Sequence, residues 1–213
     1  MDFRFERKYL LDNLSQNLLT QAVTLHPAGF VKAYPDRWIN NIYFDTPDLI
    51  AYHDNVAGIS NRRKYRVRWY GAEPFTIKSP RFEIKIKDNQ LGSKVIKSIP
   101  EFSLDDIRKT TDHVNKMSGS FLPLYPTLMN SYLRSYFKTT DNKFRITVDR
   151  SMTYFSLLNG TKFTRYKIKD DRAILELKYA RELDRKTDRI TQFLPFRQTK
   201  SSKYITGMEF TYL

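Results

Sequence analysis

Five segments of the sequence alternate between apolar and charged side chains with a period of two. The clearest is 64–70, where Tyr65 and Val67 alternate with Arg66 and Arg68. Successive side chains of a β-strand point to opposite faces, so each segment predicts a strand with one apolar and one charged face. The other four segments are 3–9, 82–87, 144–149 and 175–179.

Weaker sequence patterns predict further elements, which bring the expected total to about ten strands and four helices. We expect further strands at 37–45, 94–99, 132–139, 152–157, 161–168 and 203–210. We expect helices at about 12–25, 46–55, 103–117 and 182–193. No repeat or linker divides the chain. The predicted class is therefore α+β, dominated by antiparallel sheet, with one domain over 1–213.

The formal net charge of +14, from 37 Lys and Arg against 23 Asp and Glu, indicates a polyanionic partner. Cysteine is absent, which excludes disulfides and thiol catalysis. Neither a signal peptide nor an apolar run long enough to span a bilayer is visible. We expect a cytoplasmic protein, associated with a membrane at most through a partner.

The charged strand faces allow two interpretations. Such a face usually lies in water, but these faces are uniformly charged and mix both signs on single strands. A closed barrel with helices outside its apolar face would instead enclose the charges in a lumen. Burying cations is costly unless they are paired or hold a ligand, and a polyphosphate would be such a ligand. Glutamates in the lumen could then hold Mg²⁺ or Mn²⁺.

Seven segments, in order along nearly the whole chain, carry a family resemblance. They are FERKYLL (5–11), NIYFDTPDLIAYHDN (41–55), GISNRRKYRVRWYG (58–71), FEIKIK (82–87), FRITVDR (144–150), AILELKY (173–179) and TKSSKYITG (199–207). Together they resemble the vacuolar transporter chaperone (VTC) polyphosphate polymerase domain, within the triphosphate tunnel metalloenzyme, or CYTH-like, superfamily.

The resemblance implies a closed, eight-stranded antiparallel tunnel with helices packed outside. It implies transfer of the ATP γ-phosphate onto a growing inorganic polyphosphate chain, with Mn²⁺ or Mg²⁺ as the cofactor. By family analogy, a membrane protein is a further candidate partner.

The candidate site residues follow from the matching motifs. The expected catalytic residues are Lys8, Arg66, Arg68, Lys85, Glu176 and Lys203. Further candidates for phosphate binding are Lys94, Lys97, Arg134, Arg145, Lys178 and Lys200, and spacing does not decide between Lys94 and Lys97. Glu176 is the expected metal ligand, with Asp149 as a second. We expect Glu6 and Glu83 to orient the lysines through ion pairs.

Two other functions remain open. A triphosphate or polyphosphate hydrolase could use the same tunnel, although superfamily hydrolases carry a glutamate where this chain has Arg4. A module that only binds polyphosphate or nucleic acid is the second alternative. Tyr65 and Trp69 alternate with the arginines, so their rings would face away from the bound strand, and nucleic acid is not favoured.

Overall fold

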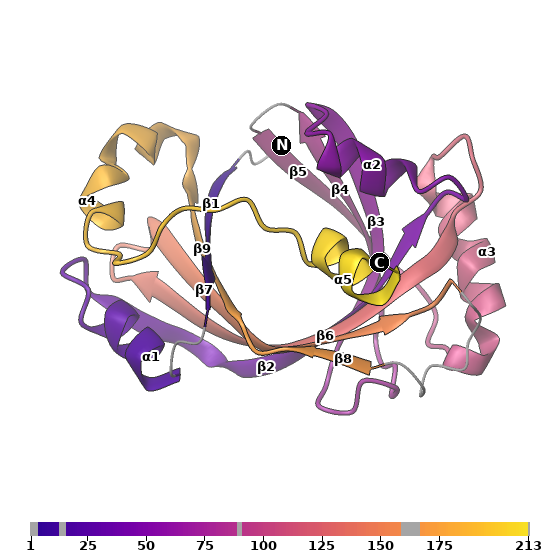
Figure 1. Ribbon diagram of the computed structural model, residues 1–213, viewed down its shortest axis with the longest axis horizontal. Coiled ribbons are helices and arrows are strands. Elements are labelled where there is room, and N and C mark those ends of the chain that lie inside the picture. Colours follow the sequence, from indigo (N-terminus) through magenta and orange to yellow (C-terminus); the bar gives the residue numbers. More distant parts are fainter. Residues whose placement is uncertain (1–3, 13–15, 89–90, 159–166, 213) are drawn as a thin grey trace. The chain divides into compact units, whose positions relative to one another are not determined.

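The computed structural model (Figure 1) describes residues 4–12, 16–88, 91–158 and 167–212. This part of the chain is a mixed α and β protein with an antiparallel sheet of nine strands and fewer helices. The strands are β1 (Arg4–Leu11), β2 (Phe30–Asp45), β3 (Asn61–Tyr70), β4 (Arg81–Asp88), β5 (Leu91–Ser98), β6 (Tyr125–Thr139), β7 (Phe144–Ser156), β8 (Lys167–Asp170) and β9 (Ala173–Ala180).

The described helices are mostly short. The α-helices are α1 (Gln16–Thr24), α2 (Ile50–Val56), α3 (Ile107–Ser118), α4 (Asp188–Thr191) and α5 (Lys203–Tyr212). Two 3₁₀ helices, η1 (Leu104–Asp106) and η2 (Arg181–Lys186), lead into α3 and α4. No described helix is both long and apolar enough to cross a membrane.

The chain divides into two compact units, each made of three segments. Unit 1 contains Met1–Arg37, Leu133–Met152 and Asp170–Ser201. Unit 2 contains Trp38–Tyr132, Thr153–Lys169 and Ser202–Leu213. The single domain expected over 1–213 stays a prediction.

Unit 2 has its core on the apolar face of β3 and β4. The two strands pair antiparallel, with Val67 opposite Phe82, and both side chains are fully buried. Ile107 and Val114 of α3 belong to the same hydrophobic cluster, so α3 covers this face. The period-two pattern places the charged side chains of β3 and β4 on the opposite face.

Unit 1 repeats this arrangement with β1, β9 and β7, which pair antiparallel in that order. Leu175 and Leu177 of β9 are fully buried in a cluster that includes Val23 of α1 and Ile190 of α4. The helices therefore cover the apolar face. The opposite face presents the charged residues of the same strands.

The expected two-faced strands are confirmed, and the four expected helices are found close to their predicted ranges. The strand expected at 203–210 is wrong, because these residues form most of α5. The strand expected at 161–168 lies largely outside the described residues, and 167–170 form β8. The structure has nine described strands in place of the eight that the resemblance implies. Closure into a tunnel stays a prediction.

Candidate functional site

Unit 2 carries a group of basic residues around one carboxylate, which we call the arginine cluster: Arg66, Arg68, Glu83 and Lys94. The β3–β4 register places Arg66 directly opposite Glu83. The Arg66 Nε and Nη2 atoms lie 2.7 and 2.6 Å from Glu83 Oε2. Lys94 Nζ lies 3.0 Å from Glu83 Oε1, and Arg68 Nη1 lies 3.8 Å from Oε2. Three cations thus share one carboxylate.

The electrostatics of the arginine cluster favour an anionic ligand. Burial by itself would raise the pKa of Glu83, but Arg66, Arg68 and Lys94 outweigh burial and lower this pKa to about 2. Burial lowers the pKa of Lys94 despite the attraction of Glu83. With Glu83 ionised, three positive charges face one negative charge, and the excess positive charge attracts anions.

Polar side chains fix the orientation of Arg68 within unit 2. Its Nε donates to Asn41 Oδ1 at 2.8 Å, and its Nη2 donates to the Tyr132 hydroxyl at 3.3 Å. Asn41 Nδ2 in turn donates to Asn130 Oδ1 at 2.8 Å. Arg68 is 7% exposed, so these partners satisfy a guanidinium that water hardly reaches.

The start of α5 adds a further basic residue close to Arg68. Lys203 Nζ lies 4.8 Å from the centroid of the Tyr132 ring, within cation–π range. Lys64 Nζ of β3 donates to Ser202 Oγ at 2.9 Å, which ties the residue before α5 to the charged face of β3. Lys203 therefore lies beside the tyrosine that also contacts Arg68.

Unit 1 carries a second group, which we call the carboxylate cluster: Glu6, Lys8, Arg134, Asp149, Glu176 and Lys178. Glu176 lies at its centre and is 5% exposed. The distances from its carboxylate oxygens are 3.3 Å to Lys8 Nζ, 3.3 Å to Arg134 Nη2 and 2.7 Å to Lys178 Nζ. The β1–β9 register explains the grouping, since it pairs Lys8 with Glu176 and Glu6 with Lys178.

The carboxylate cluster is balanced in charge, with three cations and three carboxylates. Arg134 binds Asp149 through two short contacts, from Nε at 2.5 Å and from Nη2 at 2.6 Å. Lys8 Nζ also lies 3.1 Å from Glu6 Oε1. Burial would lower the pKa of Lys8, but Glu6 and Glu176 outweigh burial and raise this pKa. The expected ion pairs of Glu6 and Glu83 with lysines are confirmed.

Glu176 and Asp149 are the carboxylates from which the expected metal site would be built. Among the described residues, no three His, Cys, Asp or Glu side chains come together as a complete metal site. Glu176 and Asp149 both contact the Arg134 guanidinium, so two hard oxygen donors lie close together. Mg²⁺ usually takes one or two carboxylates and completes its shell with water and phosphate oxygens.

The remaining candidates lie in different environments. Lys85 is half-buried on the charged face of β4, directly opposite Lys94. Lys97 is opposite Phe82 and donates to the Met117 carbonyl oxygen at 2.9 Å, so the register favours Lys94 for the charged face. Arg145 and Lys200 are exposed in unit 1, and Arg145 lies opposite Lys178.

Sequence reasoning missed three polar residues next to Arg68: Asn41, Asn130 and Tyr132. The alternation of β6 contained a signal for two of them, because Asn130 and Tyr132 share a strand face with Arg134. Asn41 could be recognised only from the β2–β3 register, which places it opposite Arg68.

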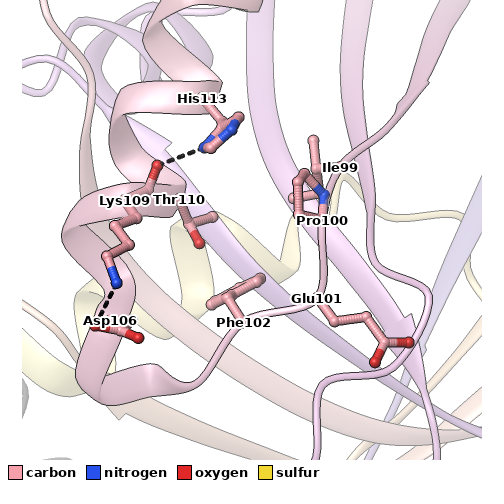
Figure 2. A pocket seen from close by; sticks show the side chains of 8 residues that line it. All are labelled: Ile99, Pro100, Glu101, Phe102, Asp106, Lys109, Thr110 and His113. Atoms are coloured by element: carbon pink, nitrogen blue, oxygen red, sulfur yellow. Dashed lines mark hydrogen bonds and ion pairs between the residues drawn. The ribbon is translucent and has the colours of Figure 1, made fainter.

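A separate pocket in unit 2, of about 200 Å³, contains no residue of either cluster (Figure 2). His113 Nδ1 lies 2.8 Å from the Lys109 carbonyl oxygen, and Lys109 pairs with Asp106. Asp106, Lys109 and His113 therefore have partners within η1 and α3. We do not assign a ligand to this pocket.

The sequence model of the VTC domain family matches residues 3–212, which is nearly the whole chain. This chain belongs to the VTC domain family. The family resemblance expected from the motifs is confirmed. No curated protein sequence matches this VTC domain significantly.

Solved structures of the CYTH, or triphosphate tunnel, fold are similar to this VTC domain. A candidate adenylate cyclase from Vibrio parahaemolyticus has a TM-score of 0.56 at 13% identity, covering 95% of this chain and 96% of that chain. A candidate adenylate cyclase from Bacillus halodurans has a TM-score of 0.57 at 16% identity, covering 96% of each chain. HpAC1 from Hippeastrum, an adenylyl cyclase candidate described as having a dominant triphosphatase activity, has a TM-score of 0.52 at 12% identity, covering 100% of this chain and 98% of that chain. At these identities the likeness concerns the fold alone.

Proposed function

We propose that this VTC domain is a metal-dependent polyphosphate polymerase that transfers the γ-phosphate of ATP onto a growing inorganic polyphosphate chain. The arginine cluster is the observation that carries the proposal. Its three cations share a single carboxylate, on a strand face that also bears Lys64 and Lys85. A ligand with closely spaced negative charges, such as a chain of phosphates, matches this arrangement.

Phosphoryl transfer requires mainly positioning and charge stabilisation from a protein. In the proposed reaction, an oxygen of the terminal phosphate of the chain forms a bond to the γ-phosphorus of ATP. The bond between this phosphorus and the β–γ bridging oxygen breaks, and ADP leaves with the electron pair. The phosphate chain is itself the nucleophile, so a Ser or Cys nucleophile is not needed. Arg66 and Arg68 would hold phosphate oxygens in place.

The carboxylate cluster supplies the residues for a divalent cation. Glu176 and Asp149 would hold Mn²⁺ or Mg²⁺, and the bound cation would neutralise charge on phosphate oxygens. Lys8, Arg134 and Lys178 surround Glu176, and they could shift from this carboxylate toward phosphate oxygens when substrate binds.

Hydrolysis of triphosphate or short polyphosphate is the second candidate function. The triphosphatase activity described for HpAC1, which shares the fold, favours it. In that reaction water would attack in place of the phosphate chain, and orthophosphate would be released. Arg4 stands where superfamily hydrolases carry a glutamate, which supports the polymerase.

The proposal is tested by incubating the protein with ATP and Mn²⁺ and staining a gel for polyphosphate. We expect long chains with the metal, none after its chelation, and at least about tenfold less product from Glu176→Gln, because the amide is a weaker ligand for a hard cation. Glu209 is an exposed residue of α5, so Glu209→Gln is the matched control and should leave the yield of polyphosphate unchanged. Equal yields from Glu176→Gln and wild type would contradict the role of Glu176.

A further inference from the structure

The first turn of α5 is attached to the end of β2 through a buried carboxylate. The Tyr204 hydroxyl donates to Asp45 Oδ2 at 2.7 Å, and Asp45 is 1% exposed. The Tyr204 ring also stacks on Tyr43, with 5.1 Å between the ring centroids. Tyr43 lies opposite Arg66 in the β2–β3 register, so this turn of α5 lies on the charged face.

Asp45 is itself held firmly. Its Oδ1 accepts hydrogen bonds from the backbone N–H groups of Thr46 and Ala51, at 2.8 and 2.9 Å. Its Oδ2 accepts a third from the Tyr52 N–H at 2.9 Å, beside the bond from Tyr204. Asp45 therefore connects the first turn of α2 to the first turn of α5. Burial and the Asp45 carboxylate raise the pKa of Tyr204, so its hydroxyl keeps the proton that it donates.

Close packing at Gly207 limits how near α5 can lie to the sheet. A Cβ atom added at Gly207 would lie 2.6 Å from Cδ1 of Tyr154, and nearer still to Leu128. Both of these side chains are fully buried. Since α5 cannot approach the sheet more closely, the attachment at Tyr204 decides where the preceding residues, Ser202 and Lys203, are held.

We propose that Asp45 is a positioning residue for phosphate binding: it holds Tyr204 and thereby keeps Lys203 and Ser202 beside the arginine cluster. The proposal rests on the proposed function. Lys203 lies next to Tyr132, whose hydroxyl accepts from Arg68, and Ser202 accepts from Lys64. Asp45 accepts four hydrogen bonds, from the backbone N–H groups of Thr46, Ala51 and Tyr52 and from the Tyr204 hydroxyl. We therefore do not expect Asp45 to contact the ligand.

The test is a double-mutant cycle read by calorimetric titration with tripolyphosphate. Tyr204→Phe deletes the hydroxyl that donates to Asp45 and accepts from Thr127 Oγ1 at 3.4 Å, and it keeps the ring on Tyr43. We expect about tenfold weaker binding than wild type, comparable to the loss of one hydrogen bond to a charged group. In the Lys203→Ala background, Tyr204→Phe should cause a smaller loss, because one of the two residues through which it acts is already gone.

Tyr212→Phe is the matched control, at the other end of the same helix. The Tyr212 hydroxyl donates to the Thr127 carbonyl oxygen at 2.8 Å and accepts from Leu158 N–H at 2.9 Å. This variant should lower the melting temperature and leave the affinity for tripolyphosphate unchanged. If it weakens binding as much as Tyr204→Phe, general loosening of α5 explains the effect and the proposal is overturned. The same holds if Tyr204→Phe weakens binding equally with and without Lys203, or not at all.

Hydrogen exchange gives a second reading that does not require binding. Tyr204→Phe should speed exchange of the amides at 203–207 and leave α2 unchanged, whereas faster exchange throughout unit 2 would overturn the proposal.

Arg66→Gln separates phosphate binding by the arginine cluster from the positioning role of Asp45. If wild type binds tripolyphosphate and Arg66→Gln binds it more weakly, phosphate binding by the arginine cluster stands whatever Tyr204→Phe does. If wild type fails to bind, the proposed function and the positioning role both fall.

Discussion

Among single residues, Arg66 makes the closest contacts with the carboxylate of the arginine cluster. Both its Nε and its Nη2 lie within 2.7 Å of Glu83 Oε2, and its side chain is 19% exposed. A phosphate can therefore reach a guanidinium whose orientation is already fixed. We predict that Arg66→Gln weakens tripolyphosphate binding about 10- to 100-fold, the scale of one or two lost charge-assisted hydrogen bonds. Calorimetric titration measures the change.

Arg63 provides the matched control for Arg66. It lies on the same strand and carries the same charge, but it is exposed and points to the opposite strand face. Arg63→Gln should change tripolyphosphate affinity less than about threefold, because an exposed charge is screened by solvent. Equal losses from the two variants would show that net charge, and not the arrangement of the cluster, determines binding.

Glu83 makes stability depend on pH. Its pKa is lowered from 4.5 to about 2, so its ionised form stabilises the folded state above pH 4.5, and this contribution is lost as the pH falls through 2. A shift of this size corresponds to about 3 kcal/mol. Urea unfolding should therefore show Glu83→Gln to be less stable than wild type at pH 7. The difference should shrink by about 3 kcal/mol by pH 2, whereas an unchanged difference would contradict the pKa of Glu83.

The sequence predicted the strand faces of the site residues but not their partners. Alternation alone placed Arg66, Arg68 and Glu83 on the charged face, because the side-chain period of a strand is fixed. It could not separate Lys94 from Lys97, since that choice depends on the β4–β5 register, a long-range property. The contacts of Arg68 with Asn41 and Tyr132 likewise depend on the pairing of distant segments.

Among the elements, α5 depends most on tertiary packing. Gly207→Ala would gain about 1 kcal/mol in helix propensity. It would also push a methyl group against Leu128 and Tyr154, which are fully buried and cannot easily shift. Overpacking of this kind costs about 1–3 kcal/mol. We therefore predict a net loss in the free energy of unfolding, measured by urea titration.

Glu209→Ala, an exposed change on the same helix, is the control for Gly207→Ala. It should alter stability by less than about 0.5 kcal/mol. A Gly207→Ala protein as stable as wild type would show that α5 does not pack as closely as the structure has it.

The same helix is where the sequence-based prediction of the fold was wrong. Residues 203–210 form a helix although Tyr204, Ile205 and Thr206 favour strands and Gly207 weakens a helix. Tyr204 contacts Asp45, and Gly207 packs against Leu128 and Tyr154. All three of these partners lie far from α5 in sequence. Such contacts override local preferences, so a single sequence cannot show them.

For the whole molecule, the two described clusters differ in net charge and in chemistry. The arginine cluster has an excess of cations, which suits phosphate binding. The carboxylate cluster is balanced and holds the oxygen donors that a divalent cation prefers. The sequence predicted both kinds of residue. Only the pairing of β3 with β4, and of β1 with β9, shows which charges share a partner.

The fate of the γ-phosphate tests the central claim most directly. ATP labelled at the γ-phosphate is incubated with the protein and Mn²⁺, and the label in long polyphosphate is compared with the label in orthophosphate. The polymerase predicts most of the label in polyphosphate, with one ADP formed per phosphate added. Label released only as orthophosphate would contradict the polymerase and establish the hydrolase, and the absence of any turnover would contradict both.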